Sequence, residues 1–376
     1  MAKVFHLLPE GESFSEFHGG AISRWVANVL RGDADGVVAC PGADASWGLP
    51  LERVMILRWL PLYRKLLHAV RHRMPWAVRG RLLRLVCRPR LTAARQGDVV
   101  WVHNRPEFAA ALCEPLRKAG AQVVLHMHNV HLLTAHAEIL HALNVARIVY
   151  VSRYLENASR PALVRQVPSE VLYNGADARL FRPQRRDVAT GRAMKVLFAS
   201  RVVREKGAHL LAEALRRLKQ ANIAIEGVVV GGVAFGGSKP DRYVEELMRD
   251  APPNLTFHPY CAGAELAQLF AEADVFCLPS VWQDPFPLAP LEAMAAGLPV
   301  VASRSGGIPE ALFDGGGILV ERNSVESLTA ALRELALDPS LRCTLSEQAL
   351  RSFERHFRWE HVQQNYRAIL GRVADA

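Results

Sequence analysis

The fold is decided by the stretch DVFCLPSVWQDPFPLAPLEAMAAGLPVVASRSGGIPE at residues 274–310. Its apolar run at 275–278 ends in a Pro-Ser pair, which is typical of a buried parallel strand that runs into a loop. The loop leads into good helix formers at 291–296, and a Gly-Leu-Pro sequence ends that helix before a second apolar strand at 300–302. The stretch therefore predicts a strand, loop, helix and strand of a parallel sheet.

Two carboxylates flank the loop-to-helix junction of this stretch: Asp284 in the loop and Glu292 in the first turns of the helix. Between them Phe286, Pro287 and Leu288 bring backbone N–H groups to a helix N-terminus, where anions and sugar hydroxyls find donors. Such a site suits a ligand that carries both hydroxyls and phosphate. An ordinary crossover, with Glu292 as a solvated helix residue, is the alternative.

This pattern resembles the acidic-x7-Glu motif of retaining glycosyltransferases of the GT-B fold, in the large family 4 (glycosyl transferases group 1), whose usual form is E-x-F-G-x-x-x-x-E-A-M-A-x-G. The resemblance implies that Asp284 reaches hydroxyls of the donor hexose and that Glu292 holds the ribose of the nucleotide. The chain departs from the pattern twice: the first acid is Asp, and Pro287, which lacks an N–H, replaces the usual Gly. Both departures bear on the identity of the sugar more than on the reaction class.

Length and composition indicate an ordinary globular protein. At 376 residues, with 50% hydrophobic and 22% charged residues, the chain suits two domains of about 150 to 200 residues each. No apolar run approaches the roughly 18 residues of a membrane span. The start, MAKVFHLL, has too short an apolar core for a signal peptide, so we expect a first strand there and a cytoplasmic protein. Six cysteines without C-x-x-C or zinc spacing predict buried, reduced thiols.

The formal charge of +9 is unevenly distributed. No acidic residue lies between Glu52 and Asp98, and segment 53–95 interleaves arginines with leucines and tryptophans. An anionic membrane surface fits this pattern, because each cation near such a surface contributes about 1 kcal/mol of binding free energy. A phosphorylated acceptor and nucleic acid are further readings, although no nucleic-acid module accompanies the charge. The structural alternative is a pair of helices whose basic outer faces are solvated. We predict contact with an anionic membrane through 53–95, and no nucleic-acid partner.

A glycine pair follows the first predicted strand. The strand at 3–8 leads to a loop that closes on Gly19 and Gly20, and a helix follows at 22–30. Such a pair lets the backbone approach a phosphate. It resembles the N-terminal Gly-Gly loop of the same family, which faces the donor diphosphate. The acidic D-A-D at 33–35 precedes a strand, so we interpret it as a turn, and the prediction includes no metal ligand.

Two neighbouring strands, at 98–103 and 122–125, are each followed by polar side chains. H-N ends the first and H-M-H-N follows the second, so these side chains should meet at the carboxyl edge of the sheet, where ligands bind. Histidines there suit hydrogen bonding or proton transfer, and purely structural histidines are the alternative.

The resemblance assigns these side chains. Family members often carry a histidine after the second of these strands, near the donor sugar and the acceptor hydroxyl, and His128 matches it best. His103, Asn104, His126 and Asn129 are the predicted substrate-binding residues. The paired H-N and H-M-H-N sequences are similar to those of lipopolysaccharide-core hexosyl and N-acetylglucosaminyl transferases of Gram-negative bacteria.

Two cations follow the strand at 195–200. Arg201 and Lys206 precede a glycine and a helix, an arrangement that suits pyrophosphate; two ordinary surface cations are the alternative. The order R-x4-K-G resembles the diphosphate clamp of the family, which implies that both side chains neutralise the leaving nucleoside diphosphate and, with His128, form the catalytic set. Gly231 and Tyr260 follow the next two strands, where family members hold the nucleotide and its base.

The resemblance covers nearly the whole chain and implies an α/β protein of the GT-B class, with two Rossmann-like domains whose parallel sheets face each other across a cleft. We expect an acceptor-binding domain at 1–183, onto which a C-terminal helix at 357–376 packs, and a nucleotide-sugar domain at 193–356.

The predicted activity is retaining, metal-independent transfer of a hexose or N-acetylhexosamine. The donor is UDP-glucose or UDP-N-acetylglucosamine, with no cofactor, and the acceptor is a hydroxyl of a lipopolysaccharide-core or other lipid-linked cell-surface saccharide. A UDP-sugar 2-epimerase of the same fold and a non-catalytic membrane-surface protein are the alternatives.

Overall fold

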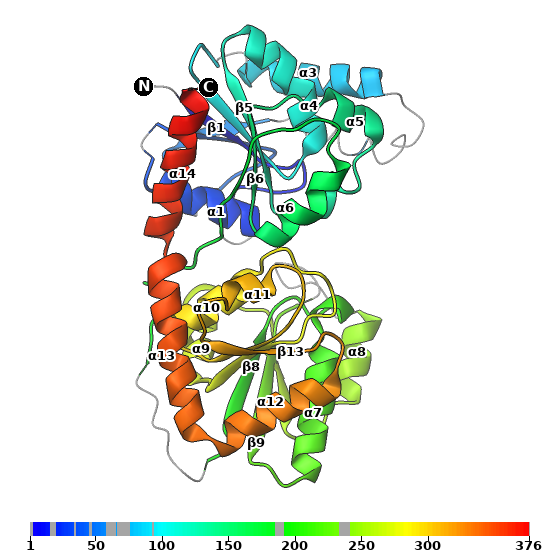
Figure 1. Ribbon diagram of the computed structural model, residues 1–376, viewed down its shortest axis with the longest axis vertical. Helices are drawn as coiled ribbons and strands as arrows, with labels where there is room; N and C mark the ends of the chain where they lie inside the picture. The colour runs from blue at the N-terminus through cyan, green and yellow to red at the C-terminus, as the bar shows by residue number, and fades with distance from the viewer. Residues whose placement is uncertain are drawn as a thin grey trace. The chain divides into compact units, whose positions relative to one another are not determined.

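The computed structural model describes residues 3–15, 20–33, 35–44, 47–57, 65, 76–91, 94–184, 192–232 and 241–375. The chain forms two compact units (Figure 1). The first unit comprises Met1–Tyr173 and Val362–Ala376, and the second comprises Asn174–His361.

The first unit contains a seven-stranded parallel sheet with the order β3-β2-β1-β4-β5-β6-β7. Its strands are β1 Val4–Leu7, β2 Val37–Cys40, β3 Val54–Ile56, β4 Val99–His103, β5 Gln122–Met127, β6 Arg147–Tyr150 and β7 Ser169–Val171. Its helices are α1 Ala21–Leu30, α3 Trp76–Leu91, α4 Pro106–Lys118, α5 Ala137–Ala142, α6 Arg153–Ser159 and α14 Trp359–Ala374, with short 3-10 turns η1 Leu51–Arg53, η2 Val130–Leu132 and η3 Arg160–Ala162.

The second unit contains a six-stranded parallel sheet with the order β10-β9-β8-β11-β12-β13. Its strands are β8 Met194–Ala199, β9 Ile225–Val230, β10 Leu255–His258, β11 Val275–Leu278, β12 Val300–Ser303 and β13 Gly317–Val320. Its helices are α7 Ala208–Gln220, α8 Arg242–Arg249, α9 Gly263–Glu272, α10 Leu288–Ala295, α11 Ile308–Ala311, α12 Val325–Leu337 and α13 Pro339–His356, with the 3-10 turn η4 Arg204–Lys206.

Both sheets reverse their strand order beside their first strand. In the first unit the reversal lies between β1 and β4, and in the second it lies between β8 and β11. Ligands of open parallel sheets bind outside the carboxyl ends of the strands at such a switch point. We therefore expect ligand sites in the loops that follow β1, β4, β8 and β11.

The sequence 274–310 folds as predicted. All four residues of β11 are buried, as expected for a strand covered on both faces. Helix α10 ends at Ala295, and Gly297 has a φ of 69°, a left-handed conformation that glycine adopts without a Cβ penalty. The predicted strand, helix and strand are confirmed.

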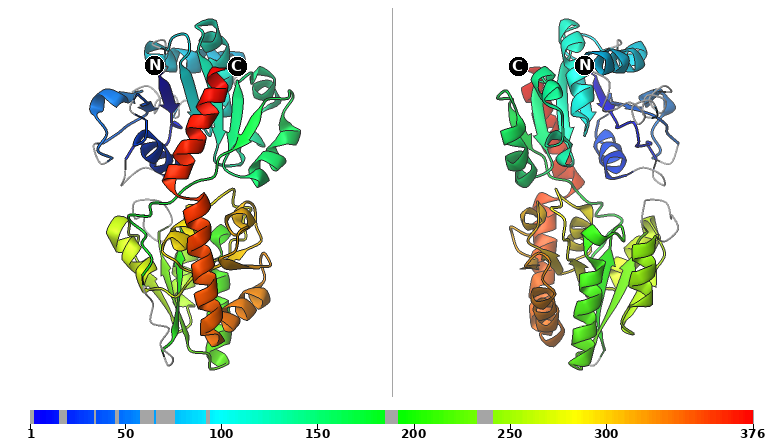
Figure 2. Two further views of the ribbon diagram at one scale, coloured as in Figure 1. Left: turned by 60° about the vertical axis from the view of Figure 1, so that its left-hand side comes forward. Right: turned by 90° about the vertical axis from the view of Figure 1, so that its right-hand side faces the viewer.

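The C-terminal helix α14 is part of the first unit from Val362 onward. Its Gln363 side chain donates to the carbonyl of Asn28 at 2.7 Å, and Arg367 donates to the carbonyl of Gly32 at 2.6 Å. These bonds connect α14 (red in Figures 1 and 2) to the last turn of α1 and to the turn that follows α1. Residues more than 330 positions apart in the sequence thus lie side by side.

The acid-free segment at residues 53–95 is described in part. Arg53 is the last residue of η1, the edge strand β3 follows it, and helix α3 forms the later part of the segment. Residues 58–64 and 66–75 lie outside the described residues. In the part of the chain that the structure covers, no helix combines the length and the apolar character needed to cross a bilayer.

The described cysteines are unpaired. Four of them are buried, as predicted, but Cys343 is exposed. This position lies on α13, whose outer face meets solvent.

Candidate functional site

The loops at the switch point of the second sheet bring two of the predicted residues into contact. Lys206 ends η4 after β8, and Asp284 lies in the loop after β11. The ammonium of Lys206 donates to the carboxylate of Asp284, and the two side chains are only 12% and 8% exposed. A buried charge without a partner is strongly destabilising. The two charges therefore hold each other in this position.

Hydrogen bonds to backbone carbonyls fix the loops that carry this pair. The hydroxyl of Ser280 donates to the carbonyl of Glu205 at 3.1 Å, and the N–H of Val281 donates to the same carbonyl at 2.9 Å. The N–H of Gly307 donates to the carbonyl of Asp284 at 2.8 Å. The loops after β8, β11 and β12 are therefore tied into one layer at the carboxyl edge of the sheet.

Two glycines allow this close packing. Gly207 has a φ of 80°, and a Cβ there would lie 2.0 Å from the carbonyl oxygen of Pro279. Gly306 has a φ of 57°, and a Cβ there would lie 2.1 Å from the carbonyl oxygen of Asp284. Both positions require glycine for backbone conformation and for space.

Other predicted residues of the second unit lie on the same edge. Arg201 is exposed in the loop after β8. Gly231, after β9, has a φ of 145°, and a Cβ there would lie 1.9 Å from the carbonyl oxygen of Ser200. Tyr260 follows β10 and is half-buried. The cation, the glycine and the aromatic ring thus follow three neighbouring strands at their carboxyl ends.

The start of α10 has the predicted form. Pro287 is the N-cap and Leu288 is the first helical residue, so the first N–H groups of the helix lack intrahelical acceptors. Phe286 is buried, and its carbonyl accepts a hydrogen bond from the Asn174 side chain at 3.0 Å. Glu292 is only 6% exposed. The alternative that Glu292 is a solvated helix residue is therefore wrong.

In the first unit a carboxylate occupies the N-terminus of α1. Gly20 is the N-cap of this helix, and Gly19 lies outside the described residues. The Glu12 carboxylate accepts a hydrogen bond from the N–H of Ser23 at 2.8 Å. Burial raises the pKa of Glu12, and hydrogen bonds from the backbone at Ser23, Gly20 and Ile22 oppose that rise. A phosphate at the predicted glycine loop would have to replace this internal anion.

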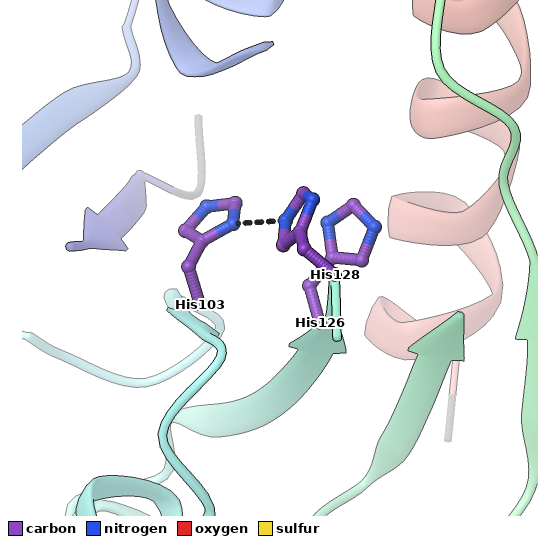
Figure 3. Close-up of side chains that lie close together, drawn as sticks. All are labelled: His103, His126 and His128. Carbon is purple, nitrogen blue, oxygen red and sulfur yellow. Dashed lines mark hydrogen bonds between the residues drawn. The ribbon is translucent and has the colours of Figure 1, made fainter. Parts of the chain in front are cut away.

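The predicted histidines of the first unit gather at the carboxyl ends of β4 and β5 (Figure 3). His103 Nδ1 lies 3.0 Å from His128 Nε2. His126 packs beside them with its ring centroid 4.0 Å from that of His128. Burial lowers the pKa of His128 to about 3 and lowers the pKa of His103 and His126 well below the ordinary value. All three imidazoles are therefore neutral near pH 7.

The two predicted asparagines shape the loops around these histidines. Asn104 has a φ of 59°, which asparagine tolerates better than most residues. Its side-chain oxygen accepts hydrogen bonds from the N–H groups of His128 and Asn129 at 2.9 and 3.1 Å. The side chain of Asn129 accepts a hydrogen bond from the N–H of His131 at 3.1 Å. Both amides therefore orient backbone, which fixes the position of His128.

Among the described residues, one group could offer three ligand atoms to a metal ion: His103, His126 and His128. One nitrogen of each ring lies within 4.8 Å of the others. Tetrahedral zinc, with Zn–N bonds of about 2.0 to 2.1 Å, needs nitrogens roughly 3.3 Å apart. His103 and His128 already share a hydrogen bond. Both ring nitrogens of His126, in contrast, have no hydrogen-bond partner among the described residues.

Sequence reasoning missed three residues of these sites: Glu12, His6 and Tyr366. His6 lies inside the buried strand β1, and a polar side chain within an otherwise apolar run was the signal. Glu12 lies in a loop, and its distance from the N-cap gave no pattern. Tyr366 meets the cluster only because α14 folds back onto the first unit.

The comparisons with known proteins identify a family for the second unit. Residues 183–352 match the family model described as glycosyl transferases group 1. Residues 183–352 therefore belong to the group 1 glycosyltransferases. The match spans almost all of the second unit, including the loops that carry Lys206, Asp284 and Glu292.

Curated relatives and solved structures extend the similarity over the first unit. The chain is 27% identical over 300 residues to spore coat protein SA of Bacillus subtilis, covering 72% of this chain and 78% of that protein. It is 26% identical over 284 residues to lipopolysaccharide 1,2-N-acetylglucosaminetransferase of Salmonella typhimurium, covering 72% of each. The crystal structure of Anabaena Alr3699/HepE with UDP and glucose has a TM-score of 0.75 and 20% identity, covering 99% of this chain and all of that one. The chain therefore has the two-domain Rossmann-like GT-B fold.

Proposed function

We propose that this group 1 glycosyltransferase moves a hexose or N-acetylhexosamine from UDP to a hydroxyl of a saccharide, with retention of anomeric configuration. The observation that carries the proposal is the contact between Lys206 and Asp284 at the switch point of the second sheet. It joins a cation for a diphosphate and an acid for sugar hydroxyls where parallel sheets bind nucleotides. The HepE structures with UDP and with UDP-glucose support the choice of donor.

The residues of the second unit have distinct roles in this proposal. Arg201 and Lys206 neutralise the diphosphate, with N–H groups at the start of α10 as further donors. Glu292 accepts hydrogen bonds from the ribose, and Asp284 accepts them from the sugar. The loops at Gly231 and Tyr260 hold the nucleotide and its base.

The chemical step follows from these charges. The bond between the anomeric carbon and the diphosphate oxygen breaks, and its electron pair stays on the leaving UDP. The oxygen of the acceptor hydroxyl bonds to the same carbon, and its proton passes to the leaving phosphate. The developing negative charge is stabilised by Arg201 and Lys206, because cations that are already in place need little rearrangement as the charge develops. These cations supply the stabilisation that a divalent metal would otherwise give.

A donor panel with product analysis tests this function. Thermal unfolding is measured with UDP, GDP and ADP, and UDP-glucose and UDP-N-acetylglucosamine are then incubated with saccharide acceptors. We expect stabilisation by UDP and an acceptor-linked sugar of unchanged anomeric configuration. A 2-epimer formed from UDP-N-acetylglucosamine without acceptor would identify an epimerase, and stabilisation by none of the nucleotides would contradict the proposal.

We also propose that a lipid-linked acceptor is reached at an anionic membrane surface through α3. One face of this helix exposes Val78, Leu82 and Leu85 by 44%, 36% and 61%. Their spacing places them on adjacent turns. Arg81 and Arg84 lie on the same helix, whose sequence contains no acidic residue. Apolar side chains flanked by cations suit the headgroup region of an anionic bilayer.

Vesicle flotation tests this surface. Replacing Val78, Leu82 and Leu85 by serine, or Arg81 and Arg84 by glutamate, is expected to abolish flotation with phosphatidylglycerol vesicles, because the helix then lacks buried apolar area or attraction to the lipid. Leu337→Ser, which alters a leucine that is 57% exposed on α12, is the matched control and should float like the wild type. Equal flotation of all variants, or none by the wild type, contradicts the membrane assignment.

A further inference from the structure

A chain of hydrogen-bonding side chains runs through the first unit from α14 to the loop after β5. The Tyr366 hydroxyl lies 2.9 Å from His6 Nε2, and His6 Nδ1 lies 3.1 Å from His103 Nε2. His103 Nδ1 lies 3.0 Å from His128 Nε2, the link drawn in Figure 3. Tyr366, His6 and His103 are 0% or 1% exposed, whereas His128 is half-buried. The chain thus starts in the core and ends at an accessible ring.

Proton counting leaves this chain two possible directions. A neutral imidazole carries one N–H and one bare nitrogen, and both nitrogens of His6 and of His103 take part in the chain. Burial lowers the pKa of His6 to about 3, as it does for His128, so no ring has a second proton near pH 7. Either every link donates toward His128, or every link donates toward Tyr366.

The tyrosine hydroxyl decides between the two directions. Its hydrogen has His6 as its hydrogen-bond partner within the described part of the chain. If the links donated toward Tyr366, this buried hydrogen would have no acceptor, which is costly. If they donate toward His128, each buried N–H and O–H has an acceptor, and the last N–H belongs to the half-buried ring. Donation toward His128 therefore satisfies every buried donor of the chain.

We propose that this chain holds His128 with its proton on Nδ1, so that His128 donates a hydrogen bond to a substrate oxygen and does not act as a base. The bare nitrogen, Nε2, is occupied by the N–H of His103. The oxygen belongs to a sugar hydroxyl or a phosphate, and this part of the inference rests on the proposed glycosyl transfer. It agrees with a step in which the leaving phosphate takes the acceptor proton.

The tautomer is measured directly by ¹⁵N NMR of the protein labelled at histidine, at pH 7.5 and without substrate. The His128 signals are assigned by their loss in His128→Asn. We expect a neutral ring with the proton on Nδ1. A proton on Nε2, or on both nitrogens, overturns the inference. Because no sugar nucleotide is present, this result does not depend on whether the protein transfers a sugar.

A pair of substitutions tests the role of the proton in turnover. The amide nitrogen of asparagine falls near the place of Nδ1, whereas that of glutamine falls near Nε2. His128→Asn is expected to stay within about tenfold of the wild-type rate of UDP release, since a neutral donor is retained. His128→Gln and His128→Ala should lose about 100-fold or more, the range for removal of one hydrogen-bond donor that stabilises developing charge. An asparagine variant as slow as the glutamine variant overturns the donor role.

Discussion

Replacement of Lys206 by methionine is expected to lower turnover at least about 100-fold, the usual effect of removing one charge-stabilising group from a reaction that develops negative charge. Methionine keeps the length and the apolar stem of lysine, so the loop after β8 keeps its packing. Initial rates of UDP release at saturating donor measure the effect. Lys219→Met, at an exposed position of α7 in the same unit, is the matched control and should keep the wild-type rate.

The ion pair with Asp284 complicates this substitution, and a double variant resolves it. Removal of the lysine alone leaves a carboxylate that is 8% exposed without its partner, which costs about 3 to 5 kcal/mol of stability. Lys206→Met/Asp284→Asn removes both charges, so urea unfolding should return toward the wild-type midpoint while turnover stays low. A double variant that is stable and nearly as active as the wild type would show that the cation does not act on the diphosphate.

The first unit is expected to unfold in mild acid, because its fold holds four histidines in the neutral form. Burial lowers the pKa of His6 and His128 to about 3 from an ordinary value of 6.5, and lowers the pKa of His103 and His126 well below it. Above pH 6.5 these rings are neutral in both the folded and the unfolded chain. Below it only the unfolded chain gains protons, so stability falls from about pH 6.5 down to the folded values.

The size of this effect is large. Each histidine removes roughly 1.4 kcal/mol of folding free energy per pH unit within this window. Because all four act in the same direction, the loss of stability on acidification should be steep for a domain of typical stability, about 5 to 15 kcal/mol. Neighbouring charges act both ways: Arg53 further lowers the pKa of His6, whereas the raised pKa of Glu12 favours the folded state as that carboxyl takes up its proton.

Urea unfolding between pH 7.5 and pH 4.5, followed by circular dichroism, checks this expectation. His126→Phe provides the comparison, since both ring nitrogens of His126 are buried without a hydrogen-bond partner among the described residues. Its ring meets Trp25 edge-on at 4.7 Å, and a phenyl ring can make the same contact. The variant should lose stability less steeply on acidification. A wild-type stability that is constant from pH 7 to pH 5 would contradict neutral buried histidines.

The sequence predicts the architecture well because parallel sheets leave strong local signals. The apolar run at 275–278 and the glycine after α10 are short-range patterns, and each is observed. The edge strand β3 is missed because only three residues pair, between Arg53 and the basic residues that follow. The flanking cations give this short strand the same mixed basic and apolar pattern as the rest of segment 53–95.

The site is predicted less completely because its decisive contacts are long-range. Motif spacing places Lys206 and Asp284 after two strands, but only the fold shows that they form an ion pair. The motif around Glu292 places this residue on a helix, but its burial follows from the packing of α10. The link from His6 to Tyr366 joins residues 360 positions apart, which no local pattern can indicate.

Calorimetric titration with UDP tests the central claim, that the carboxyl edge of the second sheet binds a nucleoside diphosphate sugar. We expect saturable binding by the wild type and by Glu334→Gln, which alters an exposed acid of α12. Glu292→Gln should bind at least about tenfold more weakly, since it loses the charge on a buried hydrogen-bond acceptor. No UDP binding by the wild type, or equal affinities of all three proteins, would contradict the account.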